Sequence, residues 1–401
     1  MKQLKFLAFP LFALVLVAFA VSSAKGTGAY TQLKTIITPG TPGFPNSVNG
    51  NFDISWYDSA HDRFYFADAR RGAGLGALEV IDVQTGTVLN TITGFLGFNA
   101  TNRAKMGPDG VLVINGTEAW VGDGNTTIKV VDLTTAAIKD TIDISSPPFS
   151  QGTTRADEEA YDAYNHIVLM TVPDAPLPYF ALVDQSGPLA GPHKVLNYVA
   201  IPDGVNGGIE QPIWDPVTRK FYLNVPNSNS NPNGGDLYQI DGPTAKITAV
   251  YHGPCAGRGL TLLPGSRAMS SCGAVFDLNS GAILSGQAHE ATGANVTADE
   301  TWYNPGDDRV YFGNNQGTVM NASTYDLIRM SNTAIRLGLA AGTIDSATYT
   351  LVTDLFGFPL PVGQTGAQVG VFGGHTVAAS STNLHVFYPV TNVGVKVFAE
   401  N

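Results

Sequence analysis

The stretch LEVIDVQTGTVLNTI, residues 78–92, decides the fold. Apolar and polar residues alternate on both sides of the short polar turn after Asp82, which is typical of two antiparallel strands joined by a tight turn. The same phrase recurs at intervals of about fifty residues, the length of one four-stranded propeller blade. Its further copies are residues 128–142, 180–189, 237–250, 274–284 and 342–355, with the aspartates Asp132, Asp184, Asp241, Asp277 and Asp345.

A second phrase precedes these copies and sets the number of blades. It is a turn followed by a short strand rich in aromatic and β-branched residues, as in DRFYF at residues 62–66. The other copies are residues 117–121, 165–169, 219–223, 266–270, 308–312 and 383–387. Seven copies predict seven blades. The irregular stretch from about residue 318 to 336 departs from the pattern, and we interpret it as an insertion in blade six.

The two ends of the chain complement each other. Residues 393–401, VGVKVFAEN, match the LEVID strand, and the chain then stops. The missing outer strand is supplied by residues 30–40, YTQLKTIITPG, which resemble VLNTITG. The sequence therefore predicts an all-β fold, a seven-bladed β-propeller closed by pairing of the N-terminal strand with the C-terminal blade. We expect residues 25–401 to form this single domain.

The first 24 residues predict export. Lys2 and Lys5 precede an apolar run at residues 6–21, and small residues follow up to Ala24. This pattern is typical of a secretory signal peptide, so we expect cleavage after Ala24 and a secreted or periplasmic protein. In an oxidising compartment the two cysteines, Cys255 and Cys272, should form a disulfide.

Charge narrows the choice of partners. Only 14% of the residues are charged, and the formal net charge is −11. Nucleic acids and anionic lipids require clustered Lys and Arg, so neither is expected as a partner. A net negative charge is compatible with cations, sugars and neutral small molecules as ligands. We expect a monomer with no membrane contact once the signal peptide is removed.

An acidic ring is predicted at one mouth of the central channel. The residues just before each inner strand face that mouth, and five of the seven blades offer a carboxylate there. The aligned positions are Asp53, Asp109, Asp157, Glu158, Glu210, Arg258, Asp299, Glu300 and His375. Like charges around a narrow channel repel one another unless something neutralises them, which favours a bound divalent cation or a small ligand.

Two sets of roles follow for these residues. As metal ligands we expect Asp157, Glu158, Glu210, Asp299 and Glu300, with Ca²⁺ favoured over Mg²⁺, while a histidine in the ring admits Mn²⁺, Fe²⁺ or Zn²⁺. As ligand-binding residues we expect Asp53, Asp109, Arg258 and His375. Three alternatives stay open: carboxylates sharing a proton, Arg258 as a counter-ion, and the acids as turn caps.

The repeated phrases resemble those of YVTN-type propellers over essentially the whole mature chain. More locally, residues 210–216, EQPIWDP, are similar to the E-G-P-x-W-D phrase of the gluconolactonase and senescence-marker-protein family. That resemblance implies that Glu210 binds a divalent metal and that the protein is a lactonase-like hydrolase, with Asp53 or His375 as base. Gln211 in place of glycine and seven blades instead of six depart from that family.

A binding protein, this hydrolase and a metal-free protein-interaction scaffold are therefore the three functional hypotheses. The tryptophans at the blade starts, Trp56, Trp214 and Trp302, are expected to pack between blades, with ring stacking on a sugar as the alternative.

Overall fold

The computed structural model describes most of the predicted propeller domain. The described residues are 30–38, 54–69, 75–99, 101–149, 152–286, 298–314, 318–323, 327–329, 344–345, 350–351, 375–390 and 394–400. The predicted signal peptide and Asp53 lie outside them. No helix within these ranges is long and apolar enough to cross a membrane.

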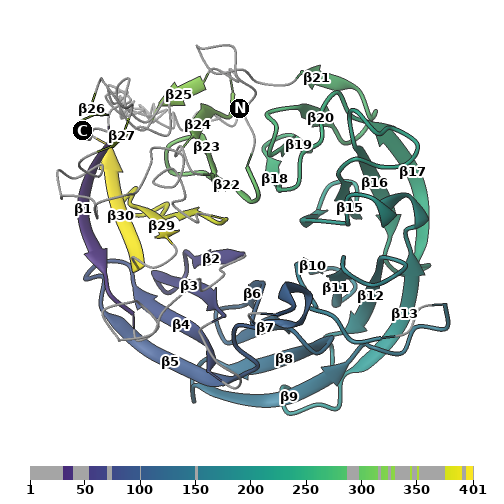
Figure 1. The fold of residues 1–401 in the computed structure, drawn as a ribbon, viewed down its shortest axis with the longest axis horizontal. Coiled ribbons are helices and arrows are strands. Elements are labelled where there is room, and N and C mark those ends of the chain that lie inside the picture. The colour runs from purple at the N-terminus through teal and green to yellow at the C-terminus, as the bar shows by residue number, and fades with distance from the viewer. Residues whose placement is uncertain are drawn as a thin grey trace, which may run out of the picture.

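Seven four-stranded antiparallel sheets stand around a ring, which confirms the seven-bladed β-propeller (Figure 1). Blade 1 contains β2 (Ser55–Asp58), β3 (Arg63–Asp68), β4 (Gly76–Asp82) and β5 (Val88–Phe95). Blade 2 contains β6 (Val111–Ile114), β7 (Glu118–Asp123), β8 (Thr127–Asp132) and β9 (Ala137–Asp143). Blade 3 contains β10 (Glu159–Asp162), β11 (Ile167–Val172), β12 (Tyr179–Asp184) and β13 (Lys194–Ala200).

The second half of the ring follows the same order. Blade 4 contains β14 (Pro212–Asp215), β15 (Lys220–Val225), β16 (Asp236–Asp241) and β17 (Lys246–His252). Blade 5 contains β18 (Leu260–Leu263), β19 (Arg267–Ser270), β20 (Val275–Asp277) and β21 (Ile283–Ser285). Blade 6 contains β22 (Thr301–Asn304), β23 (Arg309–Phe312), β24 (Thr318–Asn321) and β25 (Leu327–Arg329). Blade 7 is built from β28 (Ala378–Ala379), β29 (Val386–Val390), β30 (Gly394–Glu400) and β1 (Tyr30–Ile36). Two short 3-10 helices, Arg103–Lys105 and Pro202–Val205, lie in connecting loops.

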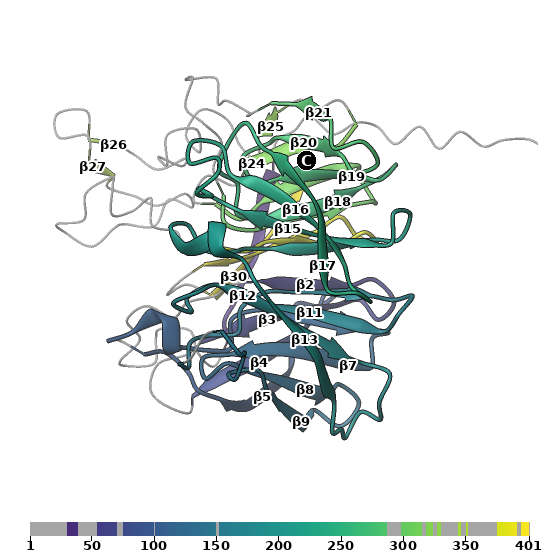
Figure 2. The same ribbon diagram turned by 90° about the vertical axis from the view of Figure 1, so that its right-hand side faces the viewer.

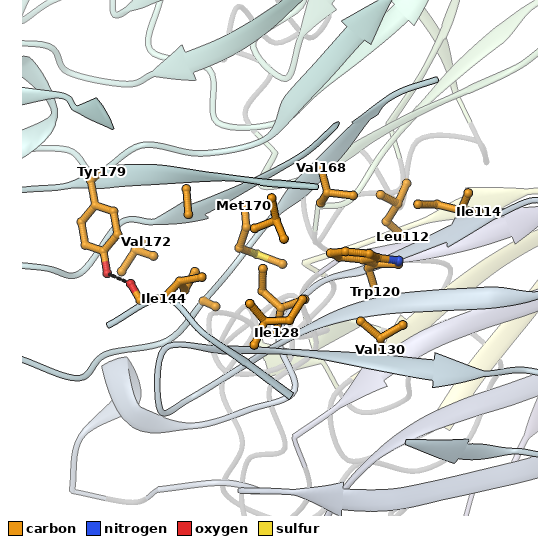
Figure 3. Close-up of a cluster of buried hydrophobic side chains, with 14 of the residues drawn as sticks. Leu112, Ile114, Trp120, Ile128, Val130, Ile144, Val168, Met170, Val172 and Tyr179 are labelled. Atoms are coloured by element: carbon orange, nitrogen blue, oxygen red, sulfur yellow. Dashed lines mark hydrogen bonds between the residues drawn. The ribbon is translucent and has the colours of Figure 1, made fainter. Parts of the chain in front are cut away.

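Burial rises from the rim of each blade toward its middle. All six residues of β11 are buried, whereas the outer strand β13 is exposed or half-buried. Between blades 2 and 3 a closed apolar cluster forms around Trp120 and Met170, and the Tyr179 hydroxyl donates to the Ile144 carbonyl at 2.7 Å (Figure 3). Because each blade buries one face against each neighbour, the ring is held together by these interblade cores. Figure 2 shows the ring from the side, with the outer strands β9, β13 and β17 of blades 2, 3 and 4 following one another.

The repeated aspartate has a structural role at the turn between the third and fourth strands. Asp132 Oδ1 accepts from the Thr134 amide at 2.9 Å, and Asp277 Oδ1 accepts from the Ser280 amide at 2.9 Å. Such aspartate side chains satisfy turn amides that have no strand partner. This local bonding explains why the phrase is visible in the sequence.

Blade 6 corrects the prediction for residues 318–336. Its described residues 318–323 and 327–329 are not an insertion, because β24 and β25 are the third and fourth strands of that blade, and the remaining residues of the range lie outside the described part of the chain. Asn321 pairs with Arg309, the register position that Asp82 holds opposite Arg63 in blade 1. An asparagine at the aspartate position concealed this copy of the phrase. The copy assigned to residues 342–355 contributes β26 (Ile344–Asp345) and β27 (Thr350–Leu351), which form a separate two-stranded sheet.

The ring closes as predicted. β1 pairs with β30 antiparallel, from Tyr30 opposite Glu400 to Ile36 opposite Val395. Arg309 of blade 6 reinforces this seam, because its guanidinium bonds to the Tyr30 hydroxyl at 2.5 Å and to Glu400 Oε1 at 2.6 Å. The N-terminal strand is thus tied both to blade 7 and to its neighbour.

Candidate binding site in the central channel

The first strand of each blade borders the central channel. Each of these strands contacts the next around the ring, from β2 through β6, β10, β14, β18, β22 and β28 back to β2. The predicted ring positions that the structure describes come one to three residues before these strands, so they lie at one end of the channel. They are Asp109, Asp157, Glu158, Glu210, Arg258, Asp299, Glu300 and His375.

One backbone hydrogen bond places the acids in the same way in four blades. The amide of each acid donates to a carbonyl of the second strand or its end: Asp109 to Gly122, Asp157 to Thr171, Glu210 to Asn224 and Asp299 to Gly313, at 3.0 to 3.2 Å. This shared bond shows that the sequence alignment of these positions corresponds to a real structural equivalence. The acids are also buried: Asp157 is 0% and the adjacent Glu158 1% exposed.

Four of the carboxylates influence one another directly. Burial raises the pKa of Glu158 well above its usual value, and hydrogen bonding to Glu300, with the charges of Glu300, Asp157 and Glu210, raises it further. Two carboxyl groups can hydrogen-bond only if one of them holds a proton. The raised pKa of Glu158 favours a proton shared between Glu158 and Glu300, which belong to blades 3 and 6.

Arg258 and His375 balance other members of the ring. Arg258 Nη1 lies 3.1 Å from Asp299 Oδ1, and its Nε lies 3.9 Å from Glu210 Oε1. His375 Nδ1 bonds to the other carboxylate oxygen of Asp299. Burial alone would raise the pKa of Asp299, but the His375 bond and the nearby positive charges outweigh it and hold the pKa at about 2. Asp299 is thus an anion held between two partners.

Arg155 is a site residue that the sequence reasoning missed. Its guanidinium lies 3.0 Å from Asp157 Oδ2, 3.8 Å from Asp109 Oδ1 and 2.7 Å from Asp174 Oδ2. It stands two residues before Asp157, outside the positions aligned on the inner strands. The only signal was an arginine within an acidic stretch, TTRADEE at residues 153–159.

The charges of the ring residues also bear on the prediction that the ring binds a metal ion. Within the part of the chain that the structure describes, no three His, Cys, Asp or Glu side chains are arranged to hold a metal ion. Two arginines, a histidine and a shared proton offset the repulsion that motivated the metal prediction. The described residues therefore do not form a ready coordination site. Asp53 is outside the described residues, so its predicted roles stay predictions.

The predicted disulfide joins Cys255 to Cys272 and anchors the loop that carries Arg258. The Arg258 amide donates to Ser271 Oγ at 2.9 Å, and Ser271 Oγ donates to the Ala298 carbonyl at 2.8 Å. Ser271 directly precedes Cys272, so the disulfide and these bonds fix one segment of the mouth. The loop of blade 5 is thereby tied to blade 6.

A cavity of about 330 Å³ lies along the channel, lined by residues in or beside the first strands of blades 1 to 6. Its walls carry Trp56, Tyr161, Trp214, Trp302 and Tyr303. The rings of Trp56 and Trp302 meet edge to face, with centroids 5.5 Å apart. The tryptophans also pack against the interblade cores, as predicted, but they present surface to the channel as well.

Among the described residues that line the cavity, Glu159 alone has a charged side chain. It is 5% exposed and directly follows Glu158. Gly110 of blade 2 makes room for it, because a Cβ there would come 2.5 Å from Glu159 Oε2 and 2.2 Å from the Asp157 carbonyl. Sequence reasoning missed Glu159, because it was counted as part of the inner strand and not as part of the ring.

Three polar atoms of the cavity wall have no hydrogen-bond partner among the described residues. They are Trp214 Nε1, Trp302 Nε1 and Thr301 Oγ1. Trp120 Nε1, in the core between blades 2 and 3, is also unpaired. All four atoms are buried from solvent, so they offer no hydrogen bond to a molecule in the cavity.

Comparisons with known proteins identify the fold and nothing finer. No family model and no curated protein matches this sequence. Among solved structures, 1173 chains match. One of them belongs to a crystal structure of the mitotic checkpoint complex, with a TM-score of 0.58, 10% sequence identity and 99% of each chain covered. At this identity the likeness shows the propeller fold alone.

Proposed function

We propose that this protein binds a small ligand in its central channel, in the aromatic cavity that the acidic ring borders at one end. The observation that carries the proposal is the cavity itself, lined by residues in or beside the inner strands of six blades. Its volume of about 330 Å³ lies within the range of small-molecule sites. Ligand sites combine such apolar walls with a few polar groups and titratable residues whose pKa is shifted.

Export is part of the proposal. The N-terminal segment has the pattern of a signal peptide, and a disulfide is typical of exported proteins. The protein would then bind its ligand outside the cytoplasm. The resemblance to YVTN-type propellers agrees with this architecture and does not specify a ligand.

A divalent cation at the acidic ring is the second candidate. Its support is the mutual influence of Glu158, Glu300, Asp157 and Glu210. A hard cation such as Ca²⁺ that displaced the shared proton would gain carboxylate oxygens, which it prefers as ligands. We expect natively purified protein then to contain one divalent ion, whose removal by chelator lowers the melting temperature. Metal-free protein with no response to added Ca²⁺, Mg²⁺, Mn²⁺ or Zn²⁺ would contradict this candidate.

The lactonase-like hydrolase and the interaction scaffold have less support. A metal hydrolase needs an open coordination position and a nearby base. Here Arg258 lies 3.9 Å from Glu210, and His375 is bonded to Asp299. A scaffold of the kind suggested by a neighbour from a protein complex needs neither the cavity nor the ring. Ligand binding in the channel separates our proposal from both.

Tryptophan fluorescence provides the test, because three of the four tryptophans line the cavity and the fourth, Trp120, is fully buried elsewhere. We expect a member of a panel of neutral, cationic and anionic small molecules to produce a saturable change. Leu262→Phe, which reduces the cavity, should weaken that binding, with melting curves to confirm folding. A panel that leaves the fluorescence unchanged throughout would contradict the proposal.

A further inference from the structure

The charge around the cavity has one sign. Among the described residues no Lys, Arg or His side chain lines it, and Glu159, whose carboxylate oxygens are buried, belongs to its lining. Six ring carboxylates stand at its acidic end, against the two arginines Arg155 and Arg258. The protein as a whole carries a net charge of −11. The potential inside the cavity is therefore negative, and it attracts cations.

The chain order places this ring directly against the cavity. Glu158 precedes the lining residue Glu159, and Glu300 precedes the lining residue Thr301. The proton shared by Glu158 and Glu300 thus lies at the acidic end of the aromatic walls. A ligand in the cavity would be within a few residues of this pair.

Aromatic faces add a second attraction for cations. The ring face of a tryptophan is the most favourable of the aromatic surfaces for an ammonium group, and aromatic cages bind quaternary ammonium ligands. Trp56 and Trp302, from blades 1 and 6, line the cavity next to each other, and Trp214 lines it from blade 4. Tyr161 and Tyr303 complete the walls.

From this geometry we infer that the cavity takes a small organic cation, such as a quaternary or tertiary ammonium compound, with Glu159 as its counter-charge. The inference deepens the proposed function and rests on it. The aromatic walls cover the apolar substituents of such a cation.

Other ligand classes fit these walls less well. A divalent metal ion requires several oxygen ligands, whereas the walls are mainly aromatic and aliphatic carbon. An anion would be repelled by the negative charge of Glu159. A neutral ligand would gain burial of its apolar surface but none of the electrostatic attraction.

Choline and its uncharged carbon isostere, 3,3-dimethyl-1-butanol, test the inference on the full mature protein. The two have the same shape and differ in charge. We expect calorimetric titration to show choline binding at least about tenfold more tightly, and added salt to weaken choline alone. Glu159→Gln should weaken choline by about tenfold and leave the isostere within about twofold.

Glu118→Gln is the matched control, because Glu118 is also buried but does not line the cavity. It should leave choline affinity unchanged. Should Glu159→Gln fail to fold, Trp214→Leu replaces it and should weaken choline by about tenfold through loss of the ring face. The comparison of choline with its isostere in the unmodified protein decides the question even without variants.

Three results would overturn the inference. Equal affinity for choline and the isostere would show that charge is not recognised, while the proposed binding function would stand. Binding of a neutral probe such as D-glucose without any binding of choline or tetramethylammonium would have the same meaning. No binding of any probe, neutral or charged, would contradict the inference and the proposed function together.

Discussion

The seam of the propeller and the mouth of its channel use similar residues in opposite ways. At the seam, Arg309 bonds to Tyr30 and Glu400, so opposite charges meet and hold the ring closed. At the mouth, Glu158 and Glu300 face each other and share a proton. A seam of complementary groups stabilises the fold, whereas buried like charges reduce stability. Retaining them is typical of a functional site.

The largest expected effect is at the seam. Arg309→Met removes the partner of two groups and leaves Glu400 without its cation, so we expect the free energy of unfolding to fall by about 3–5 kcal/mol. Denaturant unfolding measures it. Lys246→Ala, an exposed change on β17, should shift that free energy by less than about 0.5 kcal/mol. An equally small loss for Arg309→Met would show that the strand pairing of β1 and β30 alone closes the ring.

The next effect concerns the disulfide at the mouth. Cys255 and Cys272 are 17 residues apart, and a loop of that length predicts a loss of about 3 kcal/mol when both are changed to serine. Wild-type protein unfolded in the presence of a reductant should match the double variant. A difference between the two would show that the serines disturb the Arg258 loop by themselves, beyond the loss of the cross-link.

The smallest effect depends on pH and tests the shared proton. The pKa of Glu158 is raised in the folded state. The folded protein therefore holds a proton that the unfolded chain releases above about pH 4.5. Wild-type stability should therefore fall as pH rises from about 4.5 through the raised value. Glu158→Gln cannot titrate and should make this decline shallower.

Glu300→Gln supplies the matched comparison for the shared proton, because the proton belongs to the pair. Each single variant should therefore reduce the pH dependence, and the double variant should add little. Unfolding free energies measured between pH 4 and 9 decide this. A decline that stays unchanged in both variants would contradict proton sharing between Glu158 and Glu300.

Much of the fold could be predicted from local patterns in the sequence. Alternation of apolar residues and aspartate-capped turns are short-range features, so the strands around Asp82 and Asp277 were predictable. Blade 6 shows the limit of that approach. Asn321 occupies the same register as those aspartates, and a search that depended on aspartate assigned the wrong segment to the blade.

The candidate site was predictable only in part. The ring positions Asp157, Glu210 and Asp299 were found because they precede repeated strands, and the shared backbone bond confirms that they are equivalent. Their proposed metal-binding roles remain predictions. Arg155 was missed, because its contacts with Asp109 and Asp157 join segments that no sequence alignment brings together.

The sequence by itself determined seven blades, the closing strand and the disulfide, because each depends on a repeat or on a pair of unique residues. Only the tertiary structure decided which charges are neutralised and where a cavity remains. Proton sharing between blades 3 and 6 and the aromatic walls from blades 1, 3, 4 and 6 depend on distances across the channel. Such distances follow from closing the ring, and no local pattern encodes them.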